Sequence, residues 1–115
     1  MITITFEGRI PSKKNSRVKP RNCNFTIPSP EYFEWQDYAR WQARLAWRKP
    51  PTGKPVTLRV VTSCRNDIDN LMTSVMDAME GIIYHDDKQV VTVGGKKVPK
   101  DGPYMTVVEV EIMDG

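Results

Sequence analysis

The chain has 115 residues, of which 27% are charged, and a net charge of +3, a composition typical of a globular protein with one hydrophobic core. No apolar run approaches the ~20 residues that a membrane-spanning helix needs. The N-terminus lacks the charged start and apolar block of a signal peptide. We therefore expect a single domain over residues 1–115, in the cytoplasm and away from membranes.

The charge is unevenly distributed along the chain. Residues 1–59 carry twelve basic and four acidic side chains, a net charge of +8, whereas residues 60–115 carry five basic and ten acidic ones, a net charge of −5. A basic half joined to an acidic cluster fits a protein that holds a polyanion against a metal site. The alternative is a chance distribution over a mixed surface.

Residues 2–7 alternate apolar and polar side chains, which predicts a half-buried strand. A loop follows, because Gly8, Pro11 and Pro20 interrupt regular structure. Residues 9–21 hold six cations and no anion: Arg9, Lys13, Lys14, Arg17, Lys19 and Arg21. This basic loop either lies along a phosphate backbone or is a solvated loop.

A helix is predicted from Ser29 to about Trp47. Ser29 suits the N-cap and Pro30 the first helical position, and Pro50 ends the helix. An apolar stripe at helical spacing is expected to face the core: Tyr32, Trp35, Ala39, Ala43 and Ala46.

Two further features of this helix bear on function. A row of arginines four residues apart, Arg40, Arg44 and Arg48, either grips phosphates or forms a solvated face. Trp41 and Trp47 have rings that can stack on bases, but packing in the core is the simpler expectation for both.

The second half of the chain predicts a strand at residues 56–64, which are apolar and β-branched, and a helix from Asp69 that Gly81 ends. Residues 89–93, which Gly94 and Gly95 interrupt, and residues 104–112 predict two more strands, which we expect to form an antiparallel hairpin. The order β-α-β-α-β-β predicts an α+β fold with one mixed sheet and two helices on one face.

Two pairs of aspartates flank the second predicted helix: Asp67 and Asp69 precede it, and Asp86 and Asp87 follow it. In an extended segment, side chains two residues apart point to the same face. Mg²⁺ prefers a few carboxylates together with water and substrate phosphate, and it can polarise a phosphodiester and activate water. The alternative is that the first pair caps the helix and the second pair belongs to a turn.

Three motifs resemble the RusA family of Holliday-junction resolvases: Asp67-x-Asp69-Asn70-Leu71, Met76-Asp77-Ala78-Met79-x-Gly81 and Asp86-Asp87-x-Gln89-Val90. The loop Pro11-Ser12-Lys13-Lys14-Asn15 is also similar to that family. The resemblance implies a RusA-like fold and an endonuclease that uses Mg²⁺, with Mn²⁺ as a substitute. It further implies a homodimer that resolves four-way DNA junctions by paired symmetric nicks in recombination and repair. Small resolvases of this kind are often phage-encoded.

The resemblance assigns catalytic and metal-binding roles to Asp67, Asp69 and Asp87, with Asp86 as a neighbouring metal ligand. We expect nine cations to contact DNA: Lys13, Lys14, Arg17, Lys19, Arg21, Arg40, Arg44, Lys88 and Lys97.

One position departs from the family pattern. Thr73 stands where the family often has lysine, in D-x-D-N-L-x-K, and a lysine there would steady the scissile phosphate. Lys88 or Lys97 is expected to supply a cation instead. The departure leaves a second hypothesis open, a junction-binding protein with weak or lost catalysis. A third is an interaction module whose acids are only caps and turns.

Overall fold

The computed structural model describes residues 1–11, 17–18 and 27–113. The elements follow in chain order: β1 (Ile2–Glu7), β2 (Arg17–Val18), β3 (Ile27–Pro28), α1 (Pro30–Ala46), β4 (Val56–Thr62), α2 (Ile68–Met79), the short 3₁₀ helix η1 (Asp87–Gln89), β5 (Val90–Lys97) and β6 (Met105–Ile112). Among the described residues, no helix is long and apolar enough to cross a bilayer.

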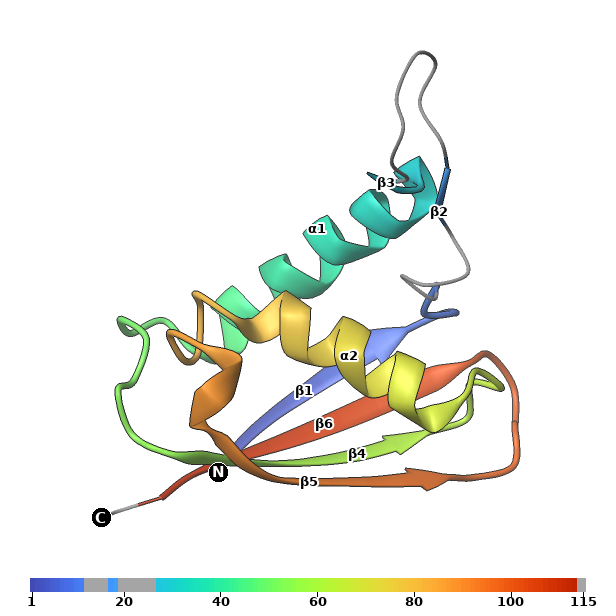
Figure 1. Cartoon of the computed structure of the whole chain (residues 1–115). Helices are drawn as coiled ribbons and strands as arrows, with labels where there is room; N and C mark the ends of the chain where they lie inside the picture. The colour runs from blue at the N-terminus through green and yellow to red at the C-terminus, as the bar shows by residue number, and fades with distance from the viewer. Residues whose placement is uncertain (12–16, 19–26, 114–115) are drawn as a thin grey trace.

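One mixed sheet carries the fold, with the strand order β1-β6-β4-β5. Strand β6 is antiparallel to both β1 and β4, while β4 and β5 are parallel. Both helices cover the same face of this sheet (Figure 1). The predicted α+β fold is confirmed. A separate short ladder joins β2 to β3.

The expected hairpin between the last two strands is wrong, because β4 lies between β5 and β6. A parallel pair such as β4 and β5 needs a crossover connection, and α2 supplies it. Strand β6 then returns through the middle of the sheet, where Thr106, Val108 and Val110 are fully buried. Its alternating pattern indicates a strand with one buried face but does not say which neighbours it has.

Strand β5 also continues through Gly94 and Gly95 instead of breaking there. A Cβ atom on Gly95 would lie 2.9 Å from both Cγ1 and Cδ1 of Ile68, in the first turn of α2. Glycine at this position therefore allows the start of α2 to lie directly on the strand.

Helix α1 begins as predicted. The Ser29 side chain accepts a hydrogen bond from the Tyr32 backbone N–H at 3.3 Å, which satisfies one of the free donors of the first turn. Four residues of the predicted stripe are buried, but Ala46, the last helical residue, is exposed.

The two tryptophans of this region differ in environment. Trp47 is half-buried and packs against the core, and its indole Nε1 donates to the Pro50 carbonyl oxygen at 3.0 Å. Trp41 is 59% exposed. The expectation that both rings pack in the core is therefore wrong for Trp41, which lies on the face of α1 opposite the buried stripe.

Candidate metal centre

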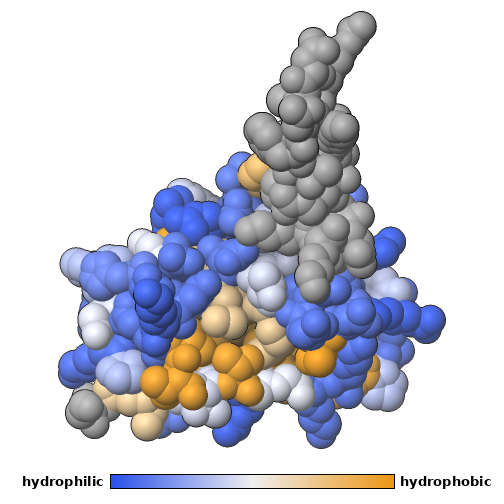
Figure 2. Space-filling view, in the orientation of Figure 1, coloured by the Kyte–Doolittle hydropathy of each residue, from blue (hydrophilic) through white to orange (hydrophobic). Residues whose placement is uncertain are grey.

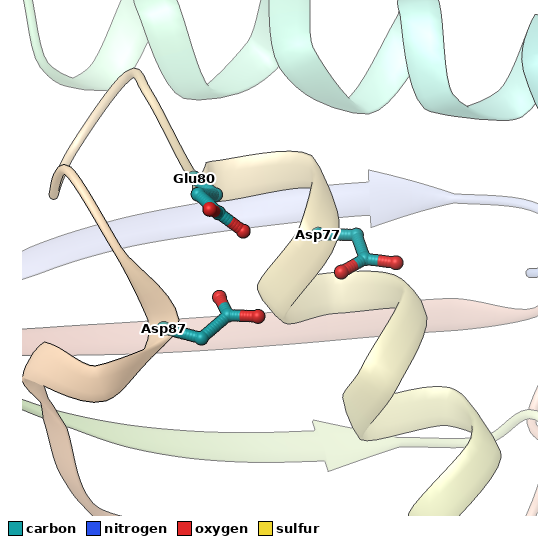
Figure 3. A group of neighbouring side chains, drawn as sticks. All are labelled: Asp77, Glu80 and Asp87. Atoms are coloured by element: carbon teal, nitrogen blue, oxygen red, sulfur yellow. The ribbon is translucent and has the colours of Figure 1, made fainter.

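Three carboxylates meet where α2 ends. Asp77 lies in the last turn of α2, Glu80 is the residue that caps it, and Asp87 opens η1. One oxygen from each lies within 4.8 Å of the others. Figure 3 shows the three side chains directed toward one another. Two come from a helix and its cap at a spacing of three residues, which places them on one face, and the third comes from the returning chain.

Gln89 fixes the turn that carries the third carboxylate. Its side-chain oxygen accepts from the backbone N–H groups of His85 and Asp86 at 2.8 and 3.0 Å. Its amide nitrogen donates to the carbonyl oxygens of Thr52 and Lys54 at 2.8 and 2.9 Å. Through these four contacts, the glutamine of the D-D-x-Q motif joins the turn that carries Asp87 to the segment before β4.

Arg40 fixes the other side of the cluster. Its Nη1 donates to the backbone carbonyl oxygen of Glu80 at 2.9 Å, and to those of Asp77 and Ala78 at 3.4 and 3.5 Å. A cation at a helix C-terminus satisfies carbonyls that have no partner within the helix and interacts favourably with the helix dipole. The half-buried Arg40 guanidinium thus positions the end of α2, and its contact with DNA stays a prediction.

The electrostatics of the cluster favour a cation. Partial burial and then the charge of Asp77 raise the pKa of Asp87 above its ordinary value. Loss of solvation and then the charges of Asp87 and Asp86 raise the pKa of Glu80. The Oδ1 atom of Asp87 is buried and has no hydrogen-bond partner.

The donor set fits Mg²⁺, since all three ligands are hard oxygen atoms. A buried acceptor without a partner is unfavourable, and the Asp87 Oδ1 atom is free to bind an ion. Mn²⁺ accepts the same ligands.

Asp67 and Asp69 lie at the opposite end of α2. Asp67 is the N-cap residue and Asp69 lies in the first turn. Ten residues separate Asp67 from Asp77, and at about 1.5 Å of rise per residue they span ~15 Å, which side chains of this length do not bridge. The expectation of one ion shared by Asp67, Asp69 and Asp87 within a single chain is therefore wrong. Helix α2 is a rod that separates the two groups of acids.

The alternative that these acids only cap and turn the chain fits some of them. Asp86 caps η1, since its Oδ1 accepts from the Lys88 backbone N–H at 2.9 Å, and it lies outside the three-carboxylate group. Asp67 makes no side-chain cap hydrogen bond although it occupies the N-cap position. Its exposed carboxylate therefore has no capping role in this structure.

The predicted DNA-binding cations are divided between the two ends of α2. Lys88 is exposed in η1, beside Asp87. Lys97 pairs with Thr62, at the end of the sheet where β4 leads toward Asp67. Lys13, Lys14, Lys19 and Arg21 lie outside the described residues, as does the side chain of Arg17.

The start of the basic loop is tied to the Asp67 end of the molecule. The Asn66 side chain donates to the carbonyl oxygen of Ile10 at 2.7 Å, and Ser74 Oγ is 3.4 Å from that of Pro11. The chain therefore enters the basic loop beside the D-x-D-N motif.

Sequence reasoning missed Asp77 and Glu80 as candidate ligands. The available signal was two acids three residues apart at a predicted helix end, followed by a glycine turn back to an Asp-Asp pair. Asp77 appeared in a family motif, but only as a helix residue.

These features define a class of α+β domain with a carboxylate cluster at a helix end. The family model for endodeoxyribonuclease RusA matches residues 7–113, which is nearly the whole chain. The protein belongs to the RusA endodeoxyribonuclease family. No curated protein matches it at a significant level. The resemblance inferred from the three sequence motifs is confirmed.

Proposed function

We propose that the protein is a Mg²⁺-dependent endonuclease that cuts four-way DNA junctions by paired nicks in recombination and repair. The observation that carries the proposal is the cluster of Asp77, Glu80 and Asp87, in which the Oδ1 atom of Asp87 is buried and has no hydrogen-bond partner. The cluster lies in a chain of an endodeoxyribonuclease family. We also propose that it acts in the cytoplasm.

Asp77, Glu80 and Asp87 would hold the ion. When bound, a divalent ion polarises the scissile phosphate and supports the attack of water and the departure of the leaving oxygen. Gln89 and Arg40 keep the ligands in place through their backbone contacts. Lys88, next to Asp87, is positioned to attract the phosphate.

The proposed assembly is a homodimer formed through β5. Among the described strands, β5 lies at the edge of the sheet and pairs only with β4. Val91 and Val93 on it are 59% and 41% exposed, and Figure 2 has apolar side chains gathered along this edge beneath α2. A free edge strand with apolar side chains favours pairing with another chain.

Antiparallel pairing of β5 with its own copy has a direct consequence for the acids. The Ile68–Gly95 contact sets the start of α2 near the C-terminal end of β5, and α2 ends near the turn that leads into β5. A twofold axis across this edge therefore turns the Asp67 end of one chain toward the acidic cluster of the other. Asp67 and Asp69 would then complete the site across the interface.

Charge supports the same orientation. Lys96 and Lys97 lie at the C-terminal end of β5, and the carboxylates lie next to its N-terminal end. In an antiparallel pair, the cationic end of each strand approaches the acidic end of its partner. A twofold dimer also suits a substrate that is itself nearly twofold.

The test is cleavage of a labelled synthetic four-way junction in Mg²⁺. We expect symmetric nicks from the wild type and none from Asp87→Asn, Asp77→Asn or Asp69→Asn. Asp37→Asn, an exposed acid on α1, is the matched control and should nick normally. An inactive wild type, or full activity of Asp87→Asn, would contradict the proposal.

Metal binding has its own readout in thermal stability. An ion that binds the folded protein raises its melting temperature in proportion to the logarithm of ion concentration. We expect this rise with Mg²⁺ or Mn²⁺ for the wild type and for Asp37→Asn, and a much smaller rise for Asp87→Asn.

A specific observation favours a second candidate, a junction-binding protein with weak or lost catalysis. Thr73 Oγ1 donates to the Asp69 carbonyl oxygen at 3.0 Å, so this position provides an intrahelical hydrogen bond and no cation. Tight junction binding without nicking in either metal would support this candidate. Thr73→Lys should then restore nicking, and an unchanged rate would mean that the lysine is not the missing group.

A further inference from the structure

A cationic groove lies between the end of α1 and the turn that follows α2. It has a volume of about 380 Å³. Seven residues line it, and none of them is acidic: Arg44, Trp47, Arg48, Lys49, Pro51, Gly81 and Ile82.

The three cations of this groove are Arg44, Arg48 and Lys49. Within the described part of the chain, neither Arg44, Arg48 nor Lys49 pairs with a carboxylate, and the ion pair between Arg59 and Glu109, 3.7 Å long, lies on the other face of the sheet. Because Arg44, Arg48 and Lys49 line the same groove, their like charges repel one another. A bound polyanion would remove that repulsion.

One wall of the groove is held rigidly. The Trp47 indole donates to the Pro50 carbonyl oxygen, and Lys49 Nζ lies 5.3 Å from the centroid of the Trp47 ring. The opposite side is formed by Gly81, whose φ of +84° favours glycine. Gly81 directly follows Glu80, so the groove adjoins the three-carboxylate cluster.

An exposed aromatic ring continues the same surface. Trp41 precedes Arg44 by three residues, so both lie on one face of α1, and Arg48 follows just beyond the end of the helix. Its 59% exposure is unusual for so large an apolar side chain. Aromatic rings interleaved with cations are typical of surfaces that bind unpaired nucleic acid, because any base can stack on the ring.

We infer that Trp41 and the groove together bind a single-stranded or branch-point segment of DNA. Arg44, Arg48 and Lys49 would contact its phosphates, and Trp41 would stack on an unpaired base. A strand held there passes beside Glu80 and the candidate metal centre. The identity of the polyanion as DNA rests on the proposed function.

The test measures DNA affinity by fluorescence anisotropy in EDTA, where metal-dependent cleavage is absent, at several salt concentrations. The ligands are a four-way junction, a single strand and a linear duplex. The variants are Arg48→Gln, Lys49→Gln and Trp41→Ala, each compared with the wild type. Arg59→Gln is the matched control, because it removes one exposed positive charge from the opposite face of the sheet. Circular dichroism and the melting temperature check that each variant is folded.

Each groove variant should reduce the slope of log K against log salt by about one and weaken binding several-fold. Trp41→Ala should weaken binding to the single strand and the junction by roughly tenfold, since stacking contributes ~1–3 kcal/mol per base, and should leave duplex binding nearly unchanged. Arg59→Gln should behave as the wild type.

Unchanged affinity and slope in both groove variants would overturn the phosphate contacts, and an equal loss on duplex and branched DNA in Trp41→Ala would overturn the stacking. A wild type that binds junctions but never nicks them contradicts the proposed nuclease activity and leaves these groove results standing. A wild type that binds no DNA contradicts both.

Discussion

Arg40 connects the two helices through a single guanidinium group. Its contacts with three carbonyl oxygens at the end of α2 are charge-assisted and half-buried, and hydrogen bonds of this kind contribute ~1.5–3 kcal/mol. We therefore expect Arg40→Ala to lower the free energy of unfolding by about that amount, as measured by urea denaturation. Arg44→Ala, one turn away and exposed, should change it by no more than about 0.5 kcal/mol. Equal effects of the two substitutions would contradict the role given to Arg40.

The raised pKa of Asp87 determines how the free energy of unfolding should depend on pH. Its pKa in the folded protein lies above the ordinary value of 3.8, so the folded state binds this proton more tightly than the unfolded state does. Without metal, the free energy of unfolding should therefore fall as pH rises from about 4 through the raised pKa, and then level off. Asp87→Asn should flatten this part of the profile, and saturating Mg²⁺ should offset the loss at neutral pH. Urea denaturation across that range checks it, and a metal-free stability that rises there would refute it.

At the scale of elements, two adjacent glycines of β5 should respond differently to alanine. The Cβ atom of Gly95→Ala would meet the Ile68 side chain at 2.9 Å, whereas that of Gly94→Ala meets nothing within 4 Å. Overpacking of this kind costs ~1–3 kcal/mol, so Gly95→Ala should lower the melting temperature and Gly94→Ala should not. Ile68→Val combined with Gly95→Ala should recover part of the loss. Equal tolerance at both positions would mean that α2 does not rest on the strand as described.

Elements that depend on local signals could be predicted from the sequence. Ser29 and Pro30 fix the start of α1, and alternation identifies β1 and β6. The neighbours of β6 could not be predicted, because an alternating pattern shows only that one face of the strand is buried. The pattern is the same whether the strand pairs with β5 or lies between β1 and β4. Gly94 and Gly95 suggested an interruption of the strand, because the reason for a small residue at Gly95 is its contact with α2, which the strand's own sequence does not show.

Only the part of the candidate site that lies in a local sequence motif could be predicted. Asp87 was found because it lies in a distinctive motif, but its two neighbours depend on how far α2 carries the chain. Counting residues along the helix would have separated Asp67 from Asp87, since twelve helical residues at about 1.5 Å each span more than carboxylates reach. The expectation of convergence within one chain ignored that length.

At the scale of the whole molecule, the exposed edge of β5 should determine the oligomeric state. Val93→Lys places a charge on an exposed position of the proposed dimer interface, so we expect it to convert a dimer to a monomer with little change in fold. Size-exclusion chromatography with light scattering would measure this, and nicking activity should fall with dimer content. Met113→Lys, which is also 41% exposed but follows the interior strand β6 and not the edge strand β5, is the matched control. A wild-type monomer, or a Val93→Lys dimer, would rule out β5 as the interface.

The insertion of β6 between β1 and β4 has a consequence for biosynthesis. A ribosome releases β1, both helices, β4 and β5 before the strand that joins the two halves of the sheet has emerged. Until then β1 has no partner, and the nascent chain exposes the apolar side chains that β6 will later cover. We therefore expect the native sheet to close only after translation has passed Ile112, and a nascent chain arrested before Met105 to remain sensitive to protease and to bind chaperones.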